Sequence, residues 1–218
     1  MSEIEVFQDM VLTGPTSERA ALAAELIQSA ADPWIFDKKG SEDAERNALG
    51  DKGIMIFQRA GDANLPAARL VLWPKDEGYY VPNITPAEIG QLTIAQYNAL
   101  LTNFADTIAK PVARRFGYLV NITSALQNLE DWMSEEAATA LRRFSAAANK
   151  STGASHPMDE RRWFDFIIAI QRGNDEVGTD RLARWLYEVE GWSEETAHDL
   201  AGEFERGLSL LMREAETR

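Results

Sequence analysis

The chain has 218 residues, of which 45% are apolar, so it is long enough to bury the core of one sizeable domain or of two small ones. It carries 35 acidic against 22 basic residues, and this net charge of -13 disfavours a general affinity for polyanions such as DNA or anionic lipid. Because cysteine is absent, disulfide scaffolds, thiol nucleophiles and cysteine-based zinc sites are excluded.

Targeting signals are not evident in the sequence. Residues 1–5 have neither the basic region nor the apolar region of a secretory signal, and no later stretch approaches the roughly 18 consecutive apolar residues that a membrane span needs. We therefore expect a soluble cytoplasmic protein with no membrane partner. The sequons at Asn83 and Asn121 are accordingly not expected to carry glycans.

The first 123 residues mix strand and helix patterns. Apolar residues alternate loosely over 4–12, which favours a strand. A helix is expected from about Glu18 to Ala31, because apolar residues recur there at helical spacing and Pro33 follows. The polar stretch 37–52 is interpreted as a long exposed connection.

Three runs typical of strands come next, at 54–59, 68–73 and 79–84. The links between them, 61–64 and 75–78, are short and rich in turn residues. Links of this kind join antiparallel neighbours, so the sequence predicts a meander.

The clearest helix start lies at Thr93, which together with Gln96 has the pattern of a capping box. Apolar residues on one face extend this helix to about Lys110, where Pro111 should end or kink it. A similar pattern at 85–88 predicts a single helical turn. Residues 118–123 are typical of a final strand that rejoins the sheet.

From residue 124 onward the pattern is helical throughout. Four helices are expected, with starts at Ser134, Asp159, Thr179 and Ser193 and ends near Ala148, Arg172, Glu190 and Glu214. The predicted fold class is α+β. A small antiparallel sheet with flanking helices forms a domain of residues 1–123, and an all-helical C-terminal domain of residues 124–218 packs against it.

The helix predicted from Asp159 to Arg172 contains the most apolar segment, residues 163–170, which is apolar almost all the way round. We expect it at the centre of the helical part. Either its own domain or a second subunit could cover it, so a homo-oligomer stays open.

A hydroxyl-rich loop at 149–157 is one candidate site. It holds one of the two histidines together with a lysine, and its hydroxyls and backbone N–H groups are of the kind that binds an anion. Two arginines on the neighbouring helices could add charge to it. The candidate ligand-binding residues are Lys150, Ser151, Thr152, Ser155, His156, Arg142 and Arg162.

The same loop also has a purely structural interpretation. Serine, threonine and asparagine bond to their own backbone and cap neighbouring helices. Asn149 stands where a P-loop has glycine, and Asp159 brings negative charge to the start of the next helix. Since no complete catalytic or metal-ligating pattern is present, the catalytic residues stay unknown, and we expect no metal and no cofactor.

The second candidate is an acidic segment, residues 175–205. It contains ten acidic residues against Arg181 and Arg184, a local net charge of -8. The negative electrostatic field of such a segment would attract and orient a basic partner. The same composition would also arise from a solvated helix face, together with the acids that are favoured in first helical turns. The candidate partner-binding residues are Glu188, Glu190, Glu194, Glu195, Asp199 and Glu203.

The leading hypothesis is therefore a non-catalytic cytoplasmic interaction protein. It would bind a basic protein, and not nucleic acid, through its acidic helical surface, as an inhibitor or immunity-type partner does. The alternative is an enzyme or binding protein that takes a small molecule or a phosphate anion in loop 149–157. This alternative requires Lys150, His156 and an arginine to converge on one pocket.

Overall fold

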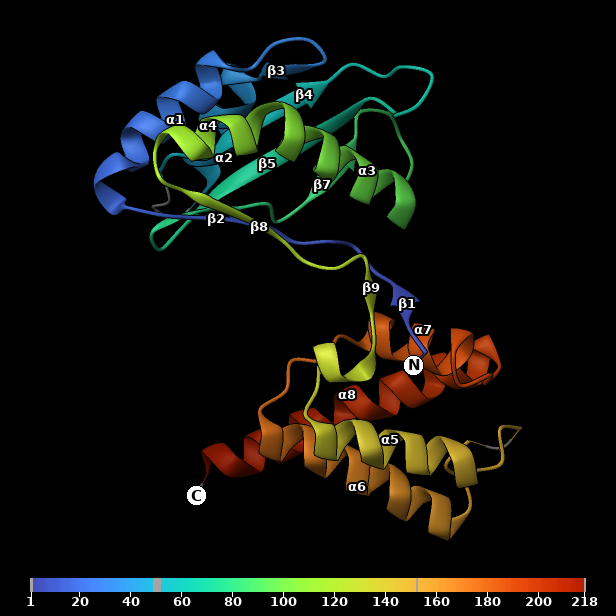
Figure 1. The fold of residues 1–218 in the computed structure, drawn as a ribbon. Helices are drawn as coiled ribbons and strands as arrows, with labels where there is room; N and C mark the ends of the chain where they lie inside the picture. Colours follow the sequence, from blue (N-terminus) through green and yellow to red (C-terminus); the bar gives the residue numbers. More distant parts are fainter. Residues whose placement is uncertain (1, 49–51, 152, 218) are drawn as a thin grey trace. The chain divides into compact units, whose positions relative to one another are not determined.

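The computed structural model describes residues 2–48, 52–151 and 153–217, and the chain forms two compact units (Figure 1). The sheet unit is Val6–Ala125. The helical unit begins at Leu126 and also includes the N-terminal segment up to Glu5. The division predicted between residues 123 and 124 lies close to this boundary, whereas the first residues were expected with the sheet. The predicted α+β class is confirmed, with a mostly antiparallel sheet and an all-helical C-terminal part.

Within the described residues, the sheet unit contains one seven-stranded sheet in which the paired strands are antiparallel. Its order is β3-β4-β5-β6-β2-β8, and β7 also pairs with β5. The strands are β2 (Met10–Thr13), β3 (Trp34–Phe36), β4 (Met55–Arg59), β5 (Ala68–Lys75), β6 (Gly78–Tyr80), β7 (Ile84–Pro86) and β8 (Leu119–Ile122).

The predicted meander is present, because β4, β5 and β6 are consecutive antiparallel neighbours. The run predicted as one strand over 79–84 is instead divided into β6 and β7. Trp73 pairs with Tyr80, but Leu70 pairs with Ile84, so the register shifts by one residue between the two strands. The segment from β6 to β7 therefore has one more residue than the stretch of β5 opposite it. An extra residue of this kind is a β-bulge, which bends the strand and divides the run predicted over 79–84 into two strands.

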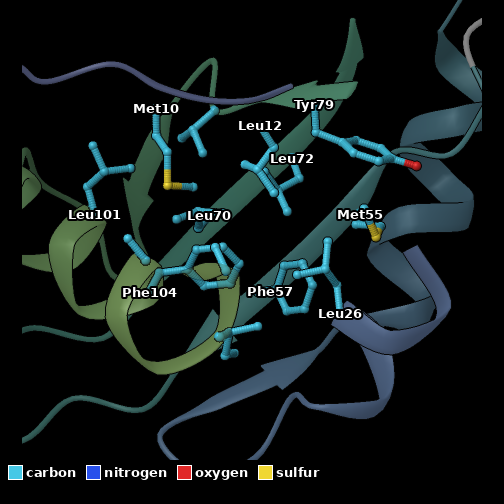
Figure 2. Close-up of a cluster of buried hydrophobic side chains, with 14 of the residues drawn as sticks. Met10, Leu12, Leu26, Met55, Phe57, Leu70, Leu72, Tyr79, Leu101 and Phe104 are labelled. Carbon is cyan, nitrogen blue, oxygen red and sulfur yellow. The ribbon is translucent and has the colours of Figure 1, made fainter. Parts of the chain in front are cut away.

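Helices α1 (Arg19–Gln28), α3 (Ile94–Phe104) and α4 (Lys110–Arg115) supply the side chains that complete the core of the sheet unit. Figure 2 shows Leu26 of α1 and Phe104 of α3 beside the strand residues Phe57 and Leu70, all of them fully buried. Along β5, alternate residues enter this core while Arg69 faces out. The sheet thus buries one face against helices, as period-two patterning requires.

The capping box predicted at Thr93 is confirmed, since its side chain accepts from the backbone N–H of Gln96 and the Gln96 side chain accepts from the backbone N–H of Thr93. Pro111 does not end the helix. A π-helical turn, Ala105–Ala109, precedes it and leads directly into α4. The wider turn accommodates a residue that has no N–H and would otherwise clash with the carbonyl four residues earlier.

Two local predictions in the sheet unit are wrong. Residues 85–88 do not form a helical turn, because Thr85 and Pro86 belong to β7. The polar stretch 37–52 is largely a helix, α2 (Lys38–Asn47). The Asp37 carboxylate accepts from the backbone N–H of Gly40 at 2.8 Å, and the Ser41 hydroxyl accepts from the backbone N–H of Ile56 on β4 at 2.9 Å. A cap and a tertiary contact therefore stabilise a helix that has almost no apolar stripe.

The helical unit has four α-helices among the described residues: α5 (Glu135–Ala147), α6 (Pro157–Gly173), α7 (Thr179–Glu188) and α8 (Glu194–Glu216). A short two-stranded ribbon accompanies them, formed by β1 (Ile4–Glu5) and β9 (Leu126–Gln127). Ser134 and Ser193 cap α5 and α8 as predicted. The caps predicted at Asp159 and Thr179 are wrong, because His156 and Gly178 hold those positions.

Helix α6 lies at the centre of the helical unit, as expected, and contacts both α5 and α8. Trp163, Phe166 and Ile170 are fully buried by the chain itself. The rings of Trp163 and Phe166 contact aromatic rings of both neighbouring helices. Between ring centroids, Phe144 of α5 lies 4.8 Å from Trp163, and Phe204 of α8 lies 5.6 Å from Phe166. These contacts fix α5, α6 and α8 relative to one another.

Candidate functional site

Loop 149–157 connects α5 to α6, and its polar groups mostly bond within the helical unit. The Lys150 ammonium donates to the carbonyl oxygen of Glu190 and lies 5.9 Å from the centroid of the Trp192 ring. Both the backbone N–H and the hydroxyl of Ser151 donate to the Asn149 side-chain oxygen, at 3.0 and 2.8 Å. Thr152 lies outside the described residues. This pattern of local bonds is typical of a loop that joins helices.

His156 caps α6. Its Nδ1 accepts from the backbone N–H of Met158 at 3.3 Å. Asp159, which was expected to be the cap, lies in the first turn of the helix, buried, and accepts from the Arg162 guanidinium at 2.6 Å. The carboxylate thus keeps a position near the helix N-terminus, where a negative charge is favoured.

The second candidate arginine, Arg142, forms a bidentate ion pair with Glu130, in which its Nη2 lies 2.9 Å from Oε2 of the carboxylate. Donation from Arg142 lowers the pKa of the Glu130 carboxyl, and the same bond raises the pKa of Arg142. Within the described residues, Lys150, His156 and the two arginines therefore each bond to a separate partner. Among the described residues, none of these four lines the cavity that Ser151 and Ser155 share.

The acidic candidates separate into two groups. Glu188 receives two bonds from Arg184, at 2.8 and 3.1 Å, and Glu190 accepts from the indole N–H of Trp185 at 3.2 Å. Both carboxylates are therefore partnered within the chain. The remaining candidates, from Glu194 onward, are exposed on the first half of α8.

Glu195, Asp199 and Glu203 lie four residues apart on α8 and line one groove between α8, α6 and loop 149–157. We call this hollow, of about 750 Å³, the acidic groove. Four residues advance a helix by slightly more than one turn, so the three carboxylates share one face. The lining comprises Ser151, Gly153, Ala154, Ser155, Glu160, Trp163, Phe164, Glu195, Thr196, Asp199, Leu200, Glu203, Arg206, Gly207 and Leu210.

Glu160, in the first turn of α6, adds a fourth carboxylate to the groove. Among the described residues, no lysine, arginine or histidine lies within 4.0 Å of any of these four carboxylates. Arg206 is the single basic residue in the lining. With four carboxylates and one arginine, the described lining of the groove carries a net negative charge.

The lining is apolar as well as acidic. Trp163 and Leu200 are buried beneath the groove, while Phe164 is 50% exposed and Leu210 is 71% exposed. The indole N–H of Trp163 is buried and has no hydrogen-bond acceptor in the part of the chain that is described. Apolar side chains left open to water beside a charged rim are typical of a surface that binds another molecule.

Within residues 2–48, 52–151 and 153–217, no three histidine, aspartate or glutamate side chains are grouped closely enough to hold a metal ion.

No described helix has both the length and the apolarity that crossing a bilayer requires.

The sequence pointed to three of the groove's carboxylates but not to its apolar residues or to Glu160. The four-residue spacing on α8 was visible in the sequence and marks one helix face. Glu160, Phe164 and Leu210 come to the groove only because α6 and α8 pack together, and no local pattern encodes that contact.

Residues 133–210 match a family model that is described as a domain of unknown function, DUF1889. The match covers less than half of the chain, but it includes every residue that lines the acidic groove. Neither curated proteins nor solved structures give a significant match to the chain.

Proposed function

We propose that this protein is a non-catalytic interaction protein that binds a basic partner protein in the acidic groove, in the manner of an inhibitor or an immunity-type partner. The observation that carries the proposal is that one groove is lined by two kinds of side chain. Four carboxylates form no ion pair among the described residues, and apolar side chains beside them are exposed. A cytoplasmic location remains a prediction that goes with this role.

The two kinds of side chain have different parts in such binding. Carboxylates at the rim accelerate association and orient a basic partner, because the field acts before contact. Phe164 and Leu210 would contribute affinity when a partner removes them from water. An anionic ligand is disfavoured in the same groove, since four carboxylates and a single arginine line it.

The proposal is tested by neutralising the groove. In the triple variant E195Q/D199N/E203Q, three carboxylates become neutral with little change of shape. The matched control E176Q/D180N/E205Q removes three exposed carboxylates that do not line the groove, and each triple includes one first-turn acid. Both variants therefore change the net charge and the helix termini equally.

The probe is a basic protein recovered from cell extract on the immobilised full chain and then purified. Its affinity for each variant is measured at low and at high salt. If each exposed ion pair contributes about 0.2–1 kcal/mol, the groove triple should weaken binding by about 3-fold to about 150-fold. The control triple should bind like the wild type. Equal affinities of the two triples, or binding that salt does not weaken, would overturn the proposal.

A further inference from the structure

The groove's shape and charge spacing also indicate what kind of partner segment it takes. We propose that the occupant is a basic amphipathic α-helix that carries lysine or arginine every fourth residue along one edge and apolar side chains on the adjacent face. This inference rests on the proposed function and adds the conformation and side-chain pattern of the bound segment.

The first step is the spacing of the charges. Glu195, Asp199 and Glu203 follow one another on α8 at four-residue intervals. With a rise of about 1.5 Å per residue, their Cα atoms are separated by about 6 Å along the helix axis, and the outer two by about 12 Å. A second helix lying along α8 repeats its own side chains at the same interval. Cations at i, i+4 and i+8 of that helix would therefore meet the three carboxylates in register.

The second step is the apolar lining. Trp163, Phe164 and Leu200 all line the groove, and Leu210 adds a further apolar side chain from the second half of α8. A basic segment without apolar residues would leave Phe164 and Leu210 in water, whereas an amphipathic helix covers them with the face next to its cations.

The third step is the size and construction of the groove. Its walls are two packed helices, α6 and α8, and the depression between neighbouring helices is where a third helix packs its side-chain ridges. A volume of about 750 Å³ accommodates a few side chains but not a whole helix. The partner helix would therefore lie over the groove and insert one face, as in other helix-in-groove complexes.

The test uses synthetic peptides with the intact protein. The probe is a fluorescent peptide of repeated Lys-Leu-Ala-Ala units, which as a helix aligns its lysines and places its leucines on the adjacent stripe. One comparison peptide has the same composition with lysines distributed around the helix, and another has a central proline that prevents a continuous helix. Affinities follow from fluorescence anisotropy, and circular dichroism reports whether the bound peptide is helical.

We expect the aligned peptide to bind at least tenfold more tightly than either comparison peptide and to gain helicity on binding. E195Q/D199N/E203Q should lose about 3-fold to about 150-fold of this affinity, as expected for three exposed ion pairs, and E176Q/D180N/E205Q should retain it. A thermal unfolding curve for each variant shows that its fold is intact.

The possible failures are distinguishable. If all three peptides bind equally and the groove triple weakens them equally, the groove takes basic segments of any conformation; the helix inference is then overturned and the proposed function stands. If no peptide binds while the basic protein from extract still depends on the groove carboxylates, the inference is likewise overturned. If that protein is indifferent to the groove triple, the proposed function itself fails.

Discussion

Helix α8 contains two interior glycines, Gly202 and Gly207, that should respond to alanine in opposite ways. Glycine in a helix interior costs roughly 0.5–1 kcal/mol relative to alanine, because its backbone loses more freedom on folding. A Cβ atom added at Gly202 would meet nothing within 4 Å. Gly202→Ala should therefore stabilise the helical unit by about 0.5–1 kcal/mol.

A Cβ atom at Gly207 would lie 3.0 Å from Cδ1 of Ile167 on α6, and 3.5 Å from its Cγ2. Ile167 is buried, so its terminal methyl has little space to move aside. Overpacking of this kind costs about 1–3 kcal/mol. After the gain in helix propensity is subtracted, Gly207→Ala should destabilise the unit by about 0–2.5 kcal/mol.

A double-mutant cycle tests this explanation. Ile167→Val removes Cδ1, the atom that would clash, and by itself should cost about 0.5–1.5 kcal/mol. In that background the contact nearest to the new Cβ is the ordinary 3.5 Å one, so Gly207→Ala should become stabilising. Gly202→Ala should have the same effect in both backgrounds, which makes it the control.

Native-state hydrogen exchange of the buried α6 amides in the intact chain measures the free energy of opening this unit directly. The reasoning is refuted if Gly207→Ala has the same effect with isoleucine and with valine at position 167. A Gly202→Ala variant that fails to stabilise would contradict the first step.

Three further changes have defined outcomes. Ser145→Ala leaves the buried indole N–H of Trp192 without its 2.9 Å acceptor and should cost about 1–3 kcal/mol by the same exchange measurement; an unchanged value would show that this bond contributes nothing. Thr93→Ala removes the α3 cap, so exchange of first-turn amides should accelerate about fivefold, as a loss of about 1 kcal/mol implies. Backbone N–H groups of residues 64 and 65 lower the pKa of Asp62 from 3.8 to about 2; its carboxylate therefore stabilises the fold above about pH 4 and loses that effect as the pH falls toward 2, and an NMR titration midpoint near 3.8 would contradict this.

The fold was most predictable where a few neighbouring residues decide the outcome. Thr93, Ser134 and Ser193 begin helices as expected, because a capping side chain bonds to a backbone N–H only two or three residues away. The N-cap predicted for α6 was wrong, because His156 holds that position and Pro157, a residue favoured at the first helical position, follows it. Asp159 instead lies in the first turn of the helix, where it forms an ion pair with Arg162.

Tertiary context decided the elements that local patterns missed. The polar sequence of α2 is helical because Ser41 bonds to strand β4, a contact that no periodicity within residues 38–47 encodes. The segment at Thr85 has a helix-start pattern but pairs with β5, since a strand in that sheet buries Ile84. Tertiary contacts of this kind override weak local propensity.

Composition, periodicity and caps are local properties, so the α+β class, the meander and the acidic character of α8 could be predicted before the tertiary structure was known. The sequence could not tell which acids would be free. Glu188 forms an ion pair with Arg184, one helical turn earlier on the same helix. Glu195 instead lines the acidic groove, to which α6 contributes Glu160. Only the packing of α6 on α8 combined carboxylates with apolar side chains in one groove, since the free energy of that contact depends on surfaces far apart in the chain.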